Sequence, residues 1–371
     1  MAEWATRHCQ ICDPSLHHEI IWPERAPDPK LSILVAGCGT SQAAILAYTN
    51  PQATVVGIDV SAASLEHATK LKTKHNLANL ELRRLDLHEA PSLGRTFDLV
   101  YATGVLHHLP NTQKGLEALV RVLKDDGVMC VMLYAKYARA GIYMVQEALR
   151  HMGTEQTLEG VAFARQVIDA LPPRHAAWTY IKGAARDLGH DAGIVDTFLH
   201  REDHAFAVPD VLALTAASGL TFQGWTDNID YYPDSAFPAD HPVYRKIASL
   251  PDAEQWAVVE LLSQPSGFHS FLLRKKSGGN GFRIDFNGDD FLTWVPHRRY
   301  LLEAAEEPGG IALSRGRHVT KLVGRERDLF LAIDGKASAG AIMQAQGRSA
   351  DATARTLFAH LWRLGHLTFS R

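Results

Sequence analysis

The residues best suited to chemistry stand where apolar, strand-like runs end. The first such run, residues 31–36 (LSILVA), leads directly into Gly37, Cys38, Gly39 and Thr40, and a helix-like run follows. Glycines at this kind of turn let the backbone come close to a ligand, and free N–H groups at the start of the next helix can bind the ligand's polar atoms. The turn therefore predicts a ligand site at the carboxyl end of the first strand.

Two carboxylates follow the next two strand-like runs. Asp59 comes directly after residues 54–58, twenty residues beyond Gly39, where a carboxylate can accept hydrogen bonds from a ribose diol. Asp86 comes directly after residues 80–85 and can accept from an exocyclic amine. Each carboxylate could instead cap a helix, and the glycines could form only a tight turn. Because all of them lie at the carboxyl ends of successive strands, we expect a nucleotide-type cofactor, with NAD as one alternative.

Two histidines follow the fourth strand-like run. His107 and His108 stand a few residues beyond residues 97–102 (FDLVYA), at the same predicted edge. A neutral imidazole there could take a proton from a reacting group. Neighbouring side chains point in different directions, so we expect one histidine to face that group and the other to pack or cap. We expect His107 in the catalytic role before His108.

Further polar and aromatic side chains lie in segments that interrupt the regular alternation of strands and helices. Tyr134 follows a fifth run at residues 127–133, and residues 196–206 (DTFLHREDHAF) contain His200 with other polar groups. Tyr231 lies in a later stretch rich in aromatic residues and proline. These side chains are candidates for substrate contact, although a solvated loop explains residues 196–206 equally well. The candidate catalytic residues are His107, His108, Tyr134, His200 and Tyr231.

The motifs together resemble those of class I S-adenosylmethionine-dependent methyltransferases. The resemblance covers about residues 31–135 and includes the glycine-rich loop VAGCGT, the acidic residue of GID, LDL after the third strand, FDLVYATGVLHHL at the fourth and VLKDDG before the fifth. It departs from the family pattern at Ser41, where these families commonly have a third glycine.

The resemblance implies S-adenosyl-L-methionine as the cofactor. The two loop glycines would pass under its methionine part, Asp59 would hold the ribose hydroxyls, Asp86 would meet the adenine amino group, and the turn at Thr103 would lie near the sulfonium. The cofactor-binding residues expected on this basis are Gly37, Cys38, Gly39, Thr40, Asp59, Val60, Asp86, Leu87, Thr103 and Gly104.

The alternation of strands and helices predicts an α/β fold, a Rossmann-like, doubly wound and mostly parallel sheet with helical insertions. We expect strands at residues 31–36, 54–58, 80–85, 97–102, 127–133, 220–226 and 269–275, and helices at 42–48, 61–75, 114–123 and 252–263. Residues 1–30 would be a leader and residues 31–276 the methyltransferase domain. Insertions at residues 138–219 and 227–267 would form a lid over the acceptor, by analogy with the family.

A flexible linker, Ser-Gly-Gly-Asn-Gly at residues 277–281, predicts a domain boundary. Beyond it, residues 281–371 would form a small α+β module with helices at 327–333, 338–345 and 349–364 and a strand at 366–370. This pattern resembles a winged-helix domain. A structural or dimerising role is our first expectation for it, peptide capture the second and nucleic-acid binding the third.

Composition and charge restrict the class of partner. The formal net charge is −3, and residues 281–371 carry 13 basic against 10 acidic residues, which leaves 25 against 31 for residues 1–280. Neither part has the concentrated positive charge that nucleic-acid binding demands, so we expect no nucleic-acid partner. Without a long apolar run we expect no membrane partner and a cytoplasmic location. A homodimer remains open.

A lone C-x-x-C motif lies near the N-terminus. Cys9 and Cys12 stand beside His8, His17 and His18, which could supply zinc ligands, but there is no second such motif in the sequence. We therefore expect no metal site and interpret the leader as exposed.

Three functions fit these patterns. The first is methyl transfer from S-adenosyl-L-methionine to an unidentified small-molecule acceptor enclosed by the insertions. The second is methylation of a peptide or protein captured by the C-terminal module. The third is a non-catalytic scaffold that binds the cofactor without turnover.

Overall fold

The computed structural model describes residues 12–264, 266–279, 281–315, 318–346 and 352–371. Within them, a seven-stranded sheet has the order β3-β2-β1-β4-β5-β7-β6. The strands are β1 Ser32–Ala36, β2 Thr54–Asp59, β3 Leu80–Arg84, β4 Phe97–Thr103, β5 Leu123–Tyr134, β6 Leu220–Trp225 and β7 Phe268–Lys275. Strand β7 is antiparallel to both its neighbours, whereas β1 to β5 pair in parallel. The predicted Rossmann-like sheet is confirmed, and each of its predicted strands overlaps an observed one.

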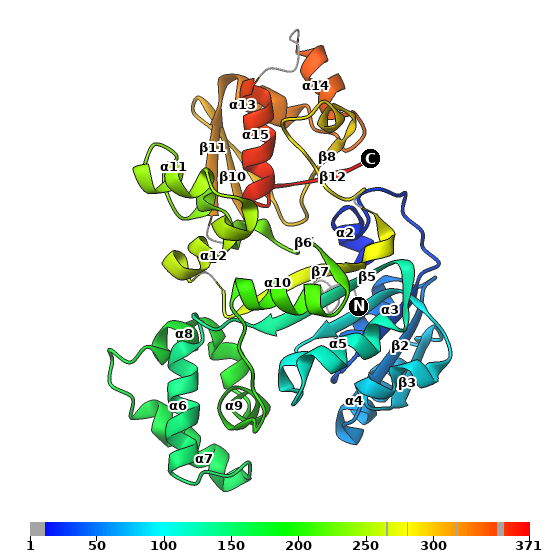
Figure 1. Ribbon diagram of the computed structural model, residues 1–371, viewed down its shortest axis with the longest axis vertical. Coiled ribbons are helices and arrows are strands. Elements are labelled where there is room, and N and C mark those ends of the chain that lie inside the picture. The colour runs from blue at the N-terminus through cyan, green and yellow to red at the C-terminus, as the bar shows by residue number, and fades with distance from the viewer. Residues whose placement is uncertain (1–11, 265, 280, 316–317, 347–351) are drawn as a thin grey trace.

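Helices cover both faces of the sheet (Figure 1). One face packs against α5 Thr112–Val120, α10 Val208–Ala217 and α12 Asp252–Ser263, and the other against α2 Pro14–Ile21, α3 Gln42–Thr49 and α4 Ala62–Lys74. Strand β1 shows why both faces of the sheet must be covered. Leu34 belongs to the core on the α5 side, while Ile33 and Val35 belong to the core on the α3 side. A parallel strand that is buried on both faces reads as a continuous apolar run, which is what made these strands predictable.

The described part of the predicted leader is not exposed. Cys12, Ile21 and Trp22 are buried in the core on the α3 side of the sheet, and the Tyr101 hydroxyl donates to the Cys12 carbonyl oxygen at 2.7 Å. The expectation of an exposed leader is therefore wrong for residues 12–22. The other half of the C-x-x-C motif, Cys9, lies outside the described residues with His8, and in the part that is described no group of three metal-ligating side chains occurs.

The first insertion forms a small helical unit with its own core. It contains α6 Ala140–His151, α7 Leu158–Asp169, α8 Ala177–Leu188, α9 Asp191–Ile194 and the π-helical turn η3 Val195–Leu199. Ile142, Val145 and Phe198 belong to this core. The predicted insertion at residues 138–219 extended too far, because α10 packs on the sheet through Val208 and Val211.

The second predicted lid segment, residues 227–267, does not lie with the first. It contains η4 Asn228–Asp230, η5 Pro233–Ser235, α11 Pro242–Ala248 and α12. Its first half binds the C-terminal domain: Asp227 pairs with Arg315 at 2.7 Å and Asp234 with His360 at 2.6 Å. Helix α12 packs on α10. The expectation that this segment helps to form the acceptor lid is therefore not supported by its position.

The C-terminal domain follows the short turn η6 Lys276–Gly278 and includes the turn η7 Asp290–Thr293, whose Phe291 lies in the core of the domain. A three-stranded antiparallel sheet has the order β11-β10-β9, and β12 pairs with β8. The elements are β8 Val295–Arg298, β9 Glu303–Glu307, β10 Gly310–Arg315, β11 His318–Val323, α13 Gly324–Leu331, α14 Ala339–Ala345, α15 Ala352–Arg363 and β12 Leu367–Ser370. The expected helices and final strand are present, while β8 to β11 were not predicted. The winged-helix description stays a prediction.

Among the described residues, no helix is long and apolar enough to cross a membrane.

Candidate cofactor and acceptor site

The loop after β1 requires glycine for two separate reasons. Gly37 and Gly39 both have positive φ, at +66° and +55°. A Cβ atom on Gly37 would stand 2.6 Å from Cγ2 of Val105, whereas a Cβ atom on Gly39 would meet nothing within 4 Å. The loop is thus packed against the β4 turn on one side and opens onto free space on the other. Ser41 has φ −138°, so the missing third glycine imposes no strain.

Asp59 connects this loop to the end of β2. Its Oδ2 accepts a hydrogen bond from the Gly39 N–H, and its Oδ1 accepts one from the Ser61 N–H, both at 2.8 Å. The carboxylate is half-buried beside Val60, whose side chain is 59% exposed. A fixed, partly exposed carboxylate next to an open glycine turn fits an adenosine ribose at this position.

Asp86 caps the turn that follows β3. Its Oδ1 accepts from the His88 backbone N–H and lies 2.8 Å from His88 Nδ1. The backbone hydrogen bond from His88 is the main reason that the pKa of Asp86 lies below its usual value. The capping interpretation therefore holds for this residue, which begins η1 Leu87–Leu93, while its contact with adenine remains a prediction.

The remaining predicted cofactor-binding residues differ in their exposure. Cys38 is buried in the core on the α3 side of the sheet, and its thiol donates to the Gly39 carbonyl oxygen at 3.7 Å. Burial, together with the nearby Asp59 carboxylate, raises the pKa of that thiol to about 12. Thr40 is exposed and Leu87 is buried. At the β4 end, Gly104 has φ +78°.

Thr103 has a partner that the sequence did not reveal. The Gln42 amide nitrogen donates to the Thr103 hydroxyl oxygen at 2.8 Å, and this hydroxyl donates to the Gln42 carbonyl oxygen at 2.9 Å. Gln42 is the first residue of α3, so the pair holds the ends of β1 and β4 together. No sequence motif indicates a contact between Gln42 and Thr103, so the contact could not be predicted.

The structure brings four of the predicted catalytic residues together at the carboxyl ends of β4 and β5. His107 is fully buried, and its ring stacks on Tyr134 with centroids 3.8 Å apart. Burial, followed by repulsion from His108, lowers the pKa of His107 to about 2, although the Asp196 carboxylate and then the Met132 carbonyl partly offset this. The expectation that His107 faces the reacting group disagrees with its complete burial.

His108 lies beside it in a charged environment. Its Nδ1 is 3.0 Å from the Glu202 carbonyl oxygen, and its Nε2 is 3.3 Å from Oδ1 of Asp196. Burial alone would lower the pKa of His108, but the contacts with Asp196 and Glu202 more than offset it and raise the pKa above its usual value. Both ring nitrogens face oxygen acceptors, which favours the doubly protonated imidazolium.

His200 stacks on His108, with ring centroids 3.9 Å apart. Its Nδ1 is hydrogen-bonded to the Glu202 backbone. Burial and then repulsion from His108 lower the pKa of His200. Nδ1 faces both the carbonyl oxygen and the N–H of Glu202, so its partners fit either tautomer. In the tautomer whose Nδ1–H donates to the carbonyl oxygen, the lone pair of His200 is on Nε2.

The carboxylate of Asp196 accepts a hydrogen bond from the Tyr134 hydroxyl at 2.6 Å. Burial alone would raise the pKa of Asp196, but its hydrogen bonds to His108 and Tyr134 lower it to about 2. It lies in the π-helical turn η3, a type of turn that is rare and often found at functional sites. The aspartate therefore stays ionised and balances the charge of His108.

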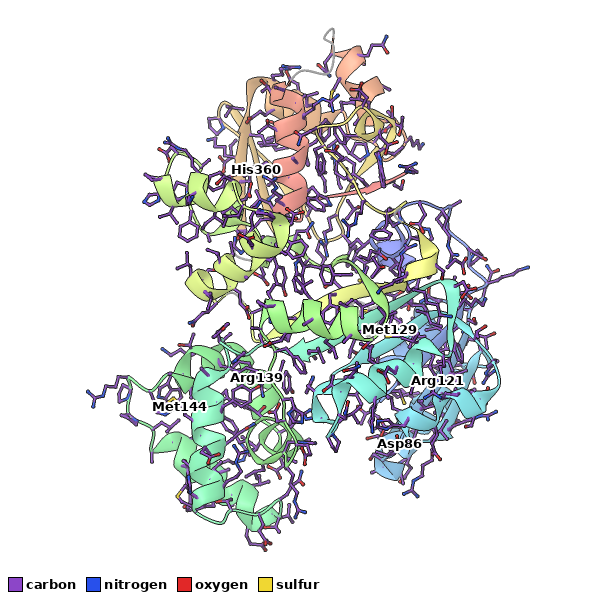
Figure 2. The ribbon with its side chains drawn as sticks, viewed as in Figure 1. Asp86, Arg121, Met129, Arg139, Met144 and His360 are labelled. Carbon is purple, nitrogen blue, oxygen red and sulfur yellow. The ribbon has the colours of Figure 1, made fainter. Side chains whose placement is uncertain are left out.

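Arg139 supports this cluster from the start of the insertion (Figure 2). Its guanidinium carbon lies 3.6 Å from the centre of the Tyr134 ring, and Nη1 donates to the Tyr180 hydroxyl at 2.7 Å. The side chain is fully buried, and its charge is met by Asp203 at 3.5 Å. Sequence reasoning did not select Arg139 or Asp196, because neither residue lies in a recognised motif.

Tyr231 is not part of the cluster. It is 4% exposed, stacks on Trp225 with ring centroids 3.6 Å apart, and its hydroxyl is hydrogen-bonded to Nδ1 of His269 at 2.9 Å. His269 in turn contacts Glu260 at 3.1 Å. The Tyr231 hydroxyl has a structural role, because it is held in this buried series of hydrogen bonds. The expectation that Tyr231 contacts substrate is therefore not supported by its position.

Comparisons with known proteins agree with this geometry. Residues 27–179 match a family model described as a methyltransferase domain. The chain is 34% identical over 143 residues to trans-aconitate 2-methyltransferase from Deinococcus radiodurans, which covers 38% of this chain and 52% of the relative. It is 29% identical over 247 residues to an uncharacterized protein from Synechococcus sp., covering 65% of this chain and 59% of the relative. The chain thus spans little more than half of each of these two relatives.

A solved structure shares the fold over almost the whole chain. PKMT2 from Rickettsia typhi, determined in complex with AdoHcy, superimposes with a TM-score of 0.66 at 15% sequence identity. The match covers 97% of this chain and 75% of the other. The family match shows that residues 27–179 form a methyltransferase domain, of the kind whose cofactor is S-adenosylmethionine, and the solved structure shows that almost the whole chain shares its fold.

Proposed function

We propose that the protein transfers a methyl group from S-adenosylmethionine to a small-molecule acceptor held between the carboxyl edge of the sheet and the helical insertion. The observation that carries the proposal is the meeting of His108 from the β4 end with Asp196 and His200 from the insertion. Residues from two separate units converge at the sheet edge where the domain family holds its cofactor.

The residues present fit the cofactor. The open face at Gly39, the Asp59 carboxylate and the exposed Val60 would hold the adenosine and methionine parts, and the Thr103 turn would adjoin the sulfonium. When bound, S-adenosylmethionine supplies an electrophilic methyl group.

The chain's own contribution is to position the acceptor and to take its proton. We assign the proton to His200 Nε2, because the lowered pKa keeps this imidazole neutral at neutral pH. Burial and the positive charge of His108 keep the pKa of His200 low, and Asp196 holds the ring of His108 in place. The buried His107 and Tyr134 stack on each other and meet the ring of His108 edge to face.

The proposal is tested by following tritiated methyl groups from S-adenosylmethionine into a cell extract separated by size. We expect label in the small-molecule fraction, and label confined to acid-precipitable protein would instead support the peptide or protein acceptor. One relative, malonyl-[acyl-carrier protein] O-methyltransferase from Acetivibrio thermocellus, is named for an acceptor carried on a protein, with 28% identity over 122 residues, which cover 33% of this chain and 42% of the relative. A folded protein that binds the cofactor and labels nothing would support the scaffold alternative.

The catalytic assignment has its own test. His200→Gln is expected to lower the rate of methyl transfer about 100-fold, a typical contribution from a general base, while cofactor binding is kept. His151→Gln serves as the control, since His151 lies in α6 of the same insertion with a side chain that is 79% exposed. Equal rates for the two variants would exclude His200 as the base.

A further inference from the structure

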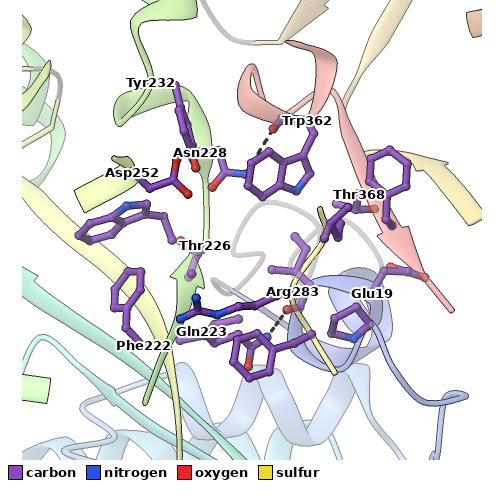
Figure 3. A pocket seen from close by; sticks show the side chains of 18 of the residues that line it. Glu19, Phe222, Gln223, Thr226, Asn228, Tyr232, Asp252, Arg283, Trp362 and Thr368 are labelled. Atoms are coloured by element: carbon purple, nitrogen blue, oxygen red, sulfur yellow. Dashed lines mark hydrogen bonds between the residues drawn. The ribbon is translucent and has the colours of Figure 1, made fainter. Parts of the chain in front are cut away.

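A cavity lies between the methyltransferase domain and the C-terminal domain, with a volume of about 620 Å³ (Figure 3). Its walls come from the edge strand β6, the start of α12, the end of α2, the linker after β7, and β12. This volume is within the range of sites that enclose small molecules.

The cavity is separate from the methyl-transfer cluster. Strands β7 and β5 lie between β6 and β4, which puts β6 about 14 Å from β4 at ordinary strand spacing. His108, Asp196 and His200 do not line it. A ligand bound in this cavity would therefore be distinct from the acceptor at the β4 end.

Aromatic rings form one end of this cavity. Tyr232 and Trp256 meet edge to face with centroids 6.2 Å apart, and Tyr232 lies 5.7 Å from Trp362. Phe222 of β6 extends the wall, 5.4 Å from Trp256. Faces of indole and phenol rings carry partial negative charge, so such a wall attracts cations.

The charges on the walls are also favourable to a cation. Asp252 lies beside Tyr232, and Glu19 is on the opposite side (Figure 3). Asp285 is the third carboxylate of the lining, against two guanidinium groups. Of these two, Arg299 is already paired with Asp227 at 3.7 Å and donates to the Thr226 carbonyl oxygen. Arg283 is exposed on the linker. A further guanidinium, that of Arg363, already lies over the Tyr232 ring, 5.3 Å from its centre.

We propose that this cavity binds a small organic cation with an alkylated ammonium group, held by the rings of Trp256 and Trp362 and by the carboxylate of Asp252. Alkylated ammonium groups shed water easily and gain most from aromatic faces, whereas the carboxylate supplies the opposite charge. The site joins both domains, so its occupant contacts residues on each side of the linker.

Choline is a suitable probe, and its neutral isostere 3,3-dimethyl-1-butanol is the matched control. Calorimetric titration of the full chain, without cofactor, is expected to show saturable binding of choline and at least about tenfold weaker binding of the alcohol. Binding of both compounds with equal affinity, or of neither, would overturn the proposal. The tryptophan fluorescence of Trp256 and Trp362 should change with choline only.

Two variants locate the site. Asp252→Asn, at an exposed position, is expected to weaken choline binding about threefold, and Trp256→Leu about tenfold. Glu254→Gln is the control, because Glu254 is exposed in the same first turn of α12 but does not line the cavity. Choline affinity unchanged by Asp252→Asn, or lowered equally by Glu254→Gln, would contradict the proposal. Because the assay contains no cofactor, its outcome is independent of whether methyl transfer occurs.

Discussion

The carboxylate of Asp59 stabilises two backbone segments at once. Its two oxygens hold the Gly39 and Ser61 backbone N–H groups, so the carboxylate orders the glycine loop and the start of α4 at once. The resemblance to the methyltransferase family assigns the same carboxylate to the cofactor ribose. Its loss should therefore affect the cofactor more than the fold.

The change Asp59→Asn is expected to weaken S-adenosylhomocysteine binding about tenfold or more, since hydrogen bonds to a charged acceptor contribute about 1.5–3 kcal/mol. Calorimetry measures the affinity, and thermal unfolding confirms that the variant is folded. Asp125→Asn is the control, because that carboxylate is 87% exposed at the start of β5. An unchanged affinity in Asp59→Asn would refute its assigned role.

The histidine cluster predicts the direction of a pH effect. His200 must be neutral to take a proton, and its pKa is lowered, so the rate should fall only as the pH drops below about 6.5. His108→Asn removes the adjacent positive charge, which raises the pKa of His200. The acid limb of the kcat/KM profile should then move to higher pH.

The His151→Asn variant controls for a general effect of removing a histidine from this region, since its side chain is largely exposed. An acid limb that stays in place or moves to lower pH in His108→Asn would show that His200 is not the group whose protonation limits the rate.

At the scale of elements, the sequence predicted the strands of the seven-stranded sheet and missed β8 to β11 of the C-terminal domain, both the buried β10 and the exposed β9. The strands of the seven-stranded sheet were found because their apolar runs are buried on two faces. Strand β9 has the sequence EAAEE and is exposed at each of its residues, so it has neither apolar alternation nor strong strand formers, and pairing with β10 alone defines it. Asp196 was missed for a related reason, since its π-helical turn has no recognisable sequence pattern.

The glycine loop allows a paired test. Gly37→Ala should destabilise the protein by about 2–4 kcal/mol, from the strain of its positive φ and from overlap with Val105. Gly39→Ala has comparable backbone strain without that overlap, so about 1 kcal/mol is expected. Denaturant unfolding measures both values. Equal losses would show that packing against Val105 is unimportant, and adding Val105→Ala should restore part of the stability of Gly37→Ala.

On the scale of the whole molecule, charged side chains connect the two domains. Asp227 stands between Arg315 at 2.7 Å and Arg299 at 3.7 Å. Burial would raise the pKa of Asp227, but the two guanidinium groups more than offset it and the pKa lies below its usual value. The ion pairs of Asp227 with Arg299 and Arg315 therefore stabilise the docked domain above a pH of about 4. This stabilisation is lost as the pH falls through the lowered pKa of Asp227.

We expect Asp227→Asn to destabilise the interface by about 3 kcal/mol, because two cations then lack their counter-charge. Cleavage by trypsin after Lys275, Lys276 or Arg283, in and near the linker, should become faster. Asp240→Asn, at an exposed position, is the control. Unchanged cleavage and unfolding in Asp227→Asn would mean that this charged group does not hold the domains together.

The most direct measurement is calorimetric titration of the full-length protein with S-adenosylhomocysteine and, separately, with NAD. A cofactor site built from the β1 loop and Asp59 predicts saturable binding of S-adenosylhomocysteine at one site per chain and no binding of NAD. A folded protein that ignores S-adenosylhomocysteine, or that binds NAD in its place, would contradict the cofactor assignment and the methyl transfer that depends on it.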